Sequence, residues 1–168
     1  MSEIRRVGLD AVDRIAAVAE RAFDPRYGEC WTAAQLRSGF AMPGYVILEL
    51  AEEDMCRAFA VIRTVAGESE LLLLATDPDH RRQGLAGLLI ERWKEEVGGG
   101  TRRFLEMRAD NPARKLYEHF GFREIGRRPN YYTGADNQLR DAITMEHFVK
   151  ESLSKFAKSE SVARNLET

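Results

Sequence analysis

The chain opens with two stretches whose apolar positions recur at helical spacing. The first is predicted to be an amphipathic helix with Asp10 as its N-cap. Its apolar stripe consists of Val12, Ile15, Ala16, Ala19, Ala22 and Phe23. Thr32 and Gln35 form a capping-box pattern, and Trp31 before the cap can pack onto Leu36 in the first turn. A second helix is therefore predicted to begin at Thr32.

The next three segments have the residue composition of β-strands. Tyr45 to Leu50 and Met55 to Val65 are rich in β-branched, aromatic and aliphatic residues, and the acidic turn Glu52 to Asp54 separates them. They are predicted to form an antiparallel hairpin. The next segment, Glu70 to Thr76, contains four consecutive leucines, which is typical of a strand buried on both faces. We expect this strand to lie at the centre of the sheet.

A crossover unit comes next. After the polar loop 77–83, a helix is predicted from about Gly84 to the glycines at 98–100, because one face is apolar and the opposite face is charged. That apolar face carries Leu85, Leu89, Trp93 and Val97. Phe104 to Met107 is predicted to be a strand, so the unit joins two parallel strands through a helix.

The last third of the chain predicts one more helix and a strand pair. Asn111 and Pro112 have the residue types of a cap and a first helical position, and Gly121 can end the helix. Strands are expected at 123–126 and 142–148, with the loop between them holding Pro129, Gly134 and Asp136. The elements together predict an α/β domain with a mixed sheet.

Size and composition fit one globular domain. A length of 168 residues is enough to bury a hydrophobic core, and 44% hydrophobic with 31% charged residues is typical of a folded protein. Beyond Lys150 the chain becomes polar and serine-rich. We expect a domain over residues 1–149 and a polar tail over 150–168, in a protein that is a monomer or a weak dimer.

Charge and cysteine content narrow the function classes. A net charge of −2 lacks the basic excess that general nucleic-acid binding requires, so no direct nucleic-acid partner is expected. No stretch approaches about 20 apolar residues, and the N-terminus has no apolar signal core, so no membrane association and a cytoplasmic location are expected. Cys30 and Cys56 are too few for a disulfide framework, and the three histidines are scattered, so no metal site is expected.

The candidate chemistry lies in the crossover loop. Arg81 to Gly87 stands between a buried strand and a helix start, where free backbone N–H groups and the helix dipole attract a phosphate. Gly84 and Gly87 would let a ligand approach the backbone, and the arginines add positive charge. The segment is therefore a candidate pyrophosphate cradle, and a plain surface loop with a solvated basic run is the alternative.

Two other nucleotide-binding motifs fit the sequence less well. No GxxxxGK[ST] sequence occurs, which excludes a P-loop. Gly84 opens a helix and Glu106 follows about 20 residues later, as in a dinucleotide-binding unit. That fingerprint places its first glycine directly after the strand, whereas residues 77–83 intervene here, and the third glycine is also misplaced.

The segment Asp77-Pro78-Asp79-His80-Arg81-Arg82-Gln83-Gly84-Leu85-Ala86 is similar to the acetyl-CoA signature RxxGxG/A of the GNAT family. Further segments resemble the bacterial ribosomal-protein alanine N-acetyltransferases, the RimI type. They are Leu105 to Asn111, Leu116 to Glu118, Gly121-Phe122 and Arg127 to Tyr132. The likeness runs from about Leu9 to Phe148 and is strongest from Leu71 to Met145.

This resemblance implies a fold, a cosubstrate and an acceptor. The GNAT fold has a central mixed antiparallel and parallel sheet flanked by about four helices. The cosubstrate would be acetyl-CoA, with no metal. The acceptor would be a protein N-terminal α-amine, such as that of a ribosomal protein, and the acetyl group would move directly within a ternary complex.

The resemblance also implies roles by position. Glu106 matches the proton acceptor of the family, Tyr117 its proton donor and Asn111 a cofactor contact. Two groups match the remaining cofactor positions: Leu74, Ala75 and Thr76 along the pantetheine and acetyl group, and Arg82, Gln83, Gly84, Leu85, Ala86 and Gly87 around the pyrophosphate.

Elementary chemistry agrees with these roles. An α-amine with a pKa near 8 is mostly protonated at pH 7 and must lose a proton before it attacks a thioester, and a carboxylate can accept that proton. A tyrosine hydroxyl can donate to the leaving thiolate. On the residues alone, a surface position for Glu106 and core packing for Tyr117 are the favoured interpretations, and it is the resemblance that reverses this preference. Tyr131 is the expected acceptor contact, although Tyr131 and Tyr132 can also simply pack a hairpin.

The sequence is also compatible with two other functions. One is a GNAT enzyme that acetylates a small amine or a lysine side chain. The other is a catalytically silent module that binds acetyl-CoA.

Overall fold

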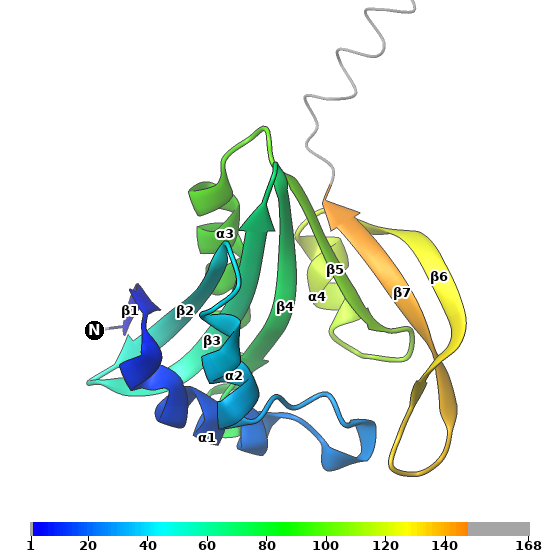
Figure 1. Cartoon of the computed structure of the whole chain (residues 1–168), viewed down its shortest axis with the longest axis horizontal. Helices are drawn as coiled ribbons and strands as arrows, with labels where there is room; N and C mark the ends of the chain where they lie inside the picture. The colour runs from blue at the N-terminus through cyan, green and yellow to red at the C-terminus, as the bar shows by residue number, and fades with distance from the viewer. Residues whose placement is uncertain (1, 148–168) are drawn as a thin grey trace, which may run out of the picture.

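The computed structural model describes residues 2–147, in which seven strands form one mixed sheet and four α-helices cover it (Figure 1). The strands are β1 (Ser2–Val7), β2 (Tyr45–Glu52), β3 (Met55–Val65), β4 (Glu68–Thr76), β5 (Arg102–Arg108), β6 (Phe122–Thr133) and β7 (Leu139–His147). The helices are α1 (Val12–Ala22), α2 (Ala33–Gly39), α3 (Leu85–Val97) and α4 (Arg114–His119). The strand order is β1-β2-β3-β4-β5-β7-β6, and only β4 and β5 pair in parallel among neighbours of this sheet.

Most predicted elements are confirmed. The capping box of α2 forms between Thr32 and Gln35, and the β2–β3 hairpin turns at Glu53 and Asp54, which both have positive φ. The α3 helix ends at Gly98 with φ +71, and α4 is closed by Gly121. The crossover and its parallel strand pair are also present, and β4 is the middle strand of the seven.

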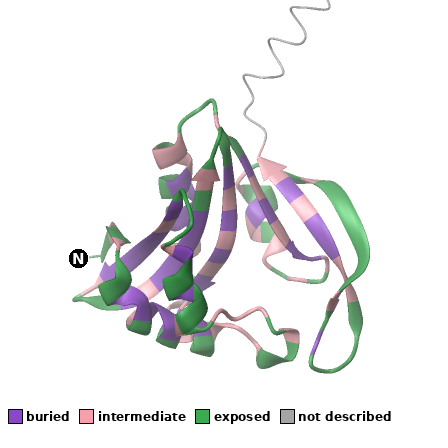
Figure 2. Ribbon diagram, in the orientation of Figure 1, coloured by how far each residue is buried: buried purple, intermediate pink, exposed green. Residues whose placement is uncertain are grey.

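The sheet separates two hydrophobic cores. Helices α3 and α4 cover one face, where Trp93 packs beside Phe122 and Leu105. Helices α1 and α2 cover the other face, where Ile15 and Leu36 join Phe59 of β3. Figure 2 shows the resulting alternation of buried and less buried positions along the central strands.

Five sequence-based expectations need correction. Asp10 does not cap α1, because a 3₁₀ turn over Leu9–Ala11 leads directly into the helix. Asn111 does not begin α4, since a turn intervenes before Arg114. Strand β4 is not buried on both faces, because alternate residues are only half-buried along a cleft.

The remaining two corrections concern sheet edges. Strand β1 was not predicted; it is an edge strand with largely exposed side chains, so its sequence lacks an apolar run. Strands β6 and β7 are longer than expected, and Pro129 lies within β6 rather than in the connecting loop. Residues 148–149 of the expected domain and the expected tail, 150–168, lie outside the described residues.

Residues 2–147 contain neither a membrane-spanning helix nor a metal-binding cluster. No helix there has the length and apolar character needed to cross a membrane. The same residues contain no group of three or more histidine, cysteine or acidic side chains placed to hold a metal ion.

Candidate active site

A cleft of about 850 Å³ opens where β4 and β5 separate. The two strands pair only from Glu68 with Arg102 to Leu71 with Leu105. Beyond that point Leu72 to Thr76 and Glu106 to Arg108 line opposite walls of the cleft. Figure 1 shows this gap in the sheet between β4 and β5. The fork thus exposes backbone and side chains from the middle of the sheet.

A β-bulge at Leu72 accompanies the separation. Val61 of β3 pairs with Leu73, whereas the next residue, Ile62, pairs with Leu71, so Leu72 is an extra residue in β4. Because a bulge bends and twists its strand, it turns the C-terminal half of β4 away from β5. Leu72 and Leu73 consequently both pack toward the α1–α2 core.

The expected phosphate-binding segment stands at one end of the cleft. Arg82 and Ala86 line the cleft, and α3 begins after Gly84 without any side-chain cap, which leaves its first N–H groups available. Arg82 and Gly84 both have left-handed backbone conformations, with φ +60 and φ +80, which shape the loop directly before the helix. What this segment offers to an anion is therefore chiefly the uncapped start of α3.

Not every residue of that segment faces the cleft. Gln83, Gly84, Leu85 and Gly87 are absent from its lining. A Cβ on Gly87 would come within 2.8 Å of the Phe120 ring, so this glycine permits helix packing rather than ligand approach. Arg81 lines the cleft, but its guanidinium donates to the carbonyl of Ala22 at 2.8 Å.

Glu106 lies on β5 in the cleft wall. Its side chain is 24% exposed. One carboxylate oxygen pairs with the guanidinium of Arg128, and the other lies 3.5 Å from the hydroxyl of Tyr132. Arg128 and Tyr132 both come from β6, so this strand supplies the immediate surroundings of the carboxylate.

An irregular stretch of β6 brings those two side chains together. Arg128 pairs with Ala142 and Tyr132 with Arg140, so three residues of β6 bulge out between them. Within the bulge, Asn130 has φ +53 and its N–H donates to a carboxylate oxygen of Asp141 at 3.0 Å. The bulge lets Arg128 and Tyr132 reach the same carboxylate.

Of the two adjacent tyrosines, the structure places Tyr132 in the cleft wall and not Tyr131. Tyr131 is 51% exposed, and the guanidinium of Arg128 lies 3.8 Å from its ring centroid. Burial, assisted by the charge of Glu106, raises the pKa of Tyr132 to about 12, so its hydroxyl stays protonated at neutral pH. Tyr132 can therefore donate to Glu106.

Tyr117 projects from α4 into the cleft wall and is 8% exposed. Its ring packs edge-on against Phe122. Burial, and secondarily the charge of Glu29, raises the pKa of Tyr117 well above its ordinary value, so it is a protonated hydroxyl throughout the physiological range. Asn111 also lines the cleft, and its side-chain oxygen accepts from the N–H of Ala113 at 2.9 Å, which shapes the turn before α4.

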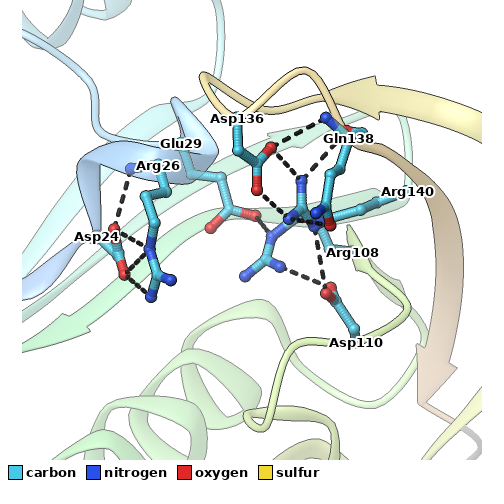
Figure 3. A network of polar contacts seen from close by, with 8 residues as sticks. All are labelled: Asp24, Arg26, Glu29, Arg108, Asp110, Asp136, Gln138 and Arg140. Atoms are coloured by element: carbon cyan, nitrogen blue, oxygen red, sulfur yellow. Dashed lines mark hydrogen bonds and ion pairs between the residues drawn. The ribbon is translucent and has the colours of Figure 1, made fainter.

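A polar network closes the other end of the cleft (Figure 3). Arg108, at the end of β5, binds Glu29 at 2.7 Å and Asp110 at 2.6 Å. Its guanidinium also lies 3.4 Å from the ring centroid of Tyr27. Arg140 of β7 stands 5.0 Å from the same ring. The network therefore ties the α1–α2 loop to β5 and β7.

Sequence reasoning missed Arg108, Arg128, Glu29 and Tyr27. One signal was present for the first of these, because Arg108 directly follows the segment predicted as a strand, Phe104 to Met107. The structure includes Arg108 in β5 and leaves it only 4% exposed. A buried arginine needs partners, which here are two carboxylates and an aromatic ring. The other three residues reach the site only through tertiary contacts.

The arrangement has the components of an acyl transfer site. A carboxylate and a protonated phenol line one cleft, which suits proton removal from one reactant and donation to a leaving group. The unpaired edge of β4 offers backbone groups to an extended ligand, and the start of α3 offers N–H groups to an anion.

Comparison with known proteins supports this chemistry. Residues 43–124 match the family model described as "Acetyltransferase (GNAT) domain". The chain is 40% identical over 104 residues to the [ribosomal protein bS18]-alanine N-acetyltransferase of Salmonella typhimurium, covering 60% of this chain and 70% of that protein.

Solved structures of N-acetyltransferases have the same fold. The crystal structure of the ribosomal-protein-S18-alanine N-acetyltransferase from Escherichia coli superposes with a TM-score of 0.78 and 31% identity, covering 88% of this chain and 93% of that one. PaiA N-acetyltransferase from Thermoplasma acidophilum, solved in complex with coenzyme A, shares the fold with a TM-score of 0.69 and 14% identity, covering 89% and 99%.

Proposed function

The chain belongs to the GNAT acetyl-CoA-dependent N-acetyltransferases of the RimI type, and we propose that its acceptor is the N-terminal α-amine of a protein that begins with alanine. A ribosomal protein is the proposed natural acceptor, because the relatives at about 40% identity are named for alanine acetylation of ribosomal protein bS18. The observation that carries the proposal is the carboxylate of Glu106 in the wall of the forked cleft.

Acetyl-CoA would lie along the unpaired edge of β4. Leu74, Ala75 and Thr76 would contact its pantetheine and acetyl portions, and the segment from Arg82 to Gly87 would surround its pyrophosphate, chiefly through backbone N–H groups. Asn111 is proposed as a further cofactor contact. Acetyl-CoA supplies the activated acetyl group, and every other step uses side chains of this chain.

Glu106 is proposed to accept the proton of the α-ammonium, directly or through one water, because only the neutral amine has a lone pair for attack. The nitrogen then bonds to the thioester carbon and loses its second proton to water, and collapse of the tetrahedral intermediate breaks the carbon–sulfur bond. The proton taken by Glu106 is released to solvent.

Tyr117 is proposed to donate to the departing sulfur. Its raised pKa keeps the hydroxyl protonated, and burial makes a full phenolate costly. Tyr117 therefore stabilises the thiolate by hydrogen bonding as the carbon–sulfur bond breaks, and the sulfur ends protonated after exchange with water.

An acceptor panel tests this proposal. Purified protein is incubated with acetyl-CoA and three acceptors: a peptide with a free N-terminal alanine, the same peptide blocked at its N-terminus with one internal lysine, and a polyamine. Mass spectrometry locates the acetyl group. Acetylation of the free α-amine is expected. Acetylation of only the lysine or the polyamine would instead show that the enzyme acts on those acceptors.

Variants separate an enzyme from a silent binding module. Glu106→Gln and Tyr117→Phe are expected to lower kcat by about 10²- to 10⁴-fold while calorimetry finds unchanged acetyl-CoA affinity. Glu95→Gln, which changes an exposed glutamate on α3, is the matched control and should retain full turnover. Equal turnover in all three variants would contradict the assigned roles.

A further inference from the structure

The carboxylate proposed as proton acceptor is already paired with a cation. Arg128 contacts one oxygen of Glu106, and the hydroxyl of Tyr132 lies near the other. An α-ammonium is also a cation that needs this carboxylate. Arg128 and the acceptor therefore compete for one partner, an inference that rests on the role proposed for Glu106.

The side chain of Arg128 is placed so that it can leave. It is 52% exposed, whereas that of Glu106 is 24% exposed. A guanidinium that is half in water can exchange its partner without leaving a buried charge behind. The arginine side of this ion pair is therefore exposed to solvent, and the glutamate side lies in the cleft.

The guanidinium of Arg128 contacts an aromatic ring at the same time as it contacts Glu106. The guanidinium of Arg128 is 3.8 Å from the ring centroid of Tyr131, within the range of a cation–π contact. Tyr131 belongs to the same β6 bulge and lies outside the cleft. The ring can hold the arginine after it releases Glu106, which explains an exposed aromatic side chain at this position.

The bulge itself is fixed independently of Arg128. Pro129 has no N–H to offer the ladder, and the N–H of Asn130 is bound by Asp141. Arg127 also donates to Asp141, at 3.2 Å. The backbone that carries Arg128 thus keeps its shape whichever partner the guanidinium takes.

We propose that Arg128 is a displaceable cation that neutralises Glu106 until the α-ammonium of the acceptor takes its place, at which point the guanidinium gives up the carboxylate and keeps its contact with the ring of Tyr131. The exchange keeps one positive charge beside the carboxylate before and after binding. An acceptor without a positive charge cannot make this exchange, so Arg128 is a positioning residue that favours protonated N-termini over blocked or neutral ones.

Steady-state kinetics with the alanine peptide test the exchange. Because Arg128→Ala removes the competitor, the KM for the peptide is expected to fall about two- to fivefold, the range for an exposed ion pair, while the KM for acetyl-CoA stays unchanged. Arg128→Lys keeps the competing charge and is expected to stay near the wild-type KM. Arg123→Ala, an exposed arginine on the same strand, is the matched control and should change neither constant.

Other outcomes would overturn the exchange. A higher peptide KM in Arg128→Ala would mean that Arg128 binds the acceptor itself, and an unchanged KM would mean that the ion pair does not compete. A fall in kcat alone would make Arg128 a catalytic residue. Arg128→Gln repeats the test if the alanine variant does not fold. An inactive wild-type protein refutes the proposed function, whereas an active wild type with an unchanged KM in the variant refutes the exchange alone.

Discussion

Glu49 offers the sharpest test of what holds the N-terminal third of the fold together. This residue of β2 is 0% exposed. Arg14 of α1 donates to both of its oxygens, at 2.6 and 2.8 Å, and Arg5 of β1 adds a bond at 3.1 Å. One carboxylate therefore joins β1, β2 and α1. Glu49→Gln keeps the size of the side chain but removes its charge and replaces an acceptor with a donor.

The expected loss follows from burial. Breaking a fully buried pair costs about 3–5 kcal/mol, but side chains of Arg5 and Arg14 are 33% and 32% exposed, so solvent screens part of the interaction. We expect Glu49→Gln to lower the free energy of unfolding by about 2–4 kcal/mol after this discount. For a domain of this size the melting temperature should fall by on the order of 10 °C.

The same residue predicts an acid dependence. Burial raises the pKa of Glu49, but hydrogen bonds from Arg14 and Arg5 outweigh burial and hold the pKa below its usual value of 4.5. Because the folded-state pKa is depressed, the stabilisation is present above about pH 4.5 and is lost as pH falls through the folded-state value. The glutamine variant lacks this contribution, so the two proteins should converge in stability at low pH.

Urea unfolding followed by circular dichroism, at pH 7 and at several values below 4.5, measures both effects. Asp13→Asn is the control, because Asp13 pairs with Arg37 on the surface and is 82% exposed; it should stay within about 0.5 kcal/mol of wild type. A Glu49→Gln protein as stable as wild type at pH 7 would refute the reasoning, as would a difference that does not shrink in acid.

Three further perturbations have defined outcomes. Gly87→Val should lower the melting temperature by pushing against the ring of Phe120, and adding Phe120→Ala should recover part of the loss. Arg103→Met should destabilise the protein by about 1–3 kcal/mol in urea unfolding, because this buried arginine donates to the carbonyl of Gly98 at the end of α3. Burial raises the pKa of the Cys56 thiol from 9.0 to about 12, so above pH 9 the folded state retains a proton that the unfolded chain loses. The free energy of unfolding should therefore fall as pH rises above 9. In Cys56→Ala, alkaline unfolding curves should show a smaller fall.

The sequence predicted those parts of the fold whose signals are local. The stripe from Val12 to Ala19, the Thr32 capping box and the crossover around Gly84 each depend on neighbours within one or two turns, and the GNAT resemblance follows the same segments. Strand β1 was missed because only Ile4 and Val7 of its six residues are apolar, which is too few to form a strand pattern. Its sequence therefore resembles that of a charged terminus.

The features that shape the site are harder to predict. The bulged residue Leu72 is identical to its neighbours, so composition cannot distinguish it from Leu71 or Leu73. Arg128 meets Glu106 only because β6 and β5 lie on either side of β7, a relation set by strand order. The roles proposed for Glu106 and Tyr117 thus came from resemblance, while their surroundings came only from the folded chain.

The fork between β4 and β5 also bears on solubility. An unpaired strand edge at the border of a sheet invites strands of other molecules, and that is how many β proteins aggregate. Here two such edges lie inside the sheet, beyond Leu71 and Leu105, where they line the cleft. They are flanked by both halves of the sheet, whereas the outer edges of β1 and β6 stand at its borders and are the ones that another copy of the chain meets first.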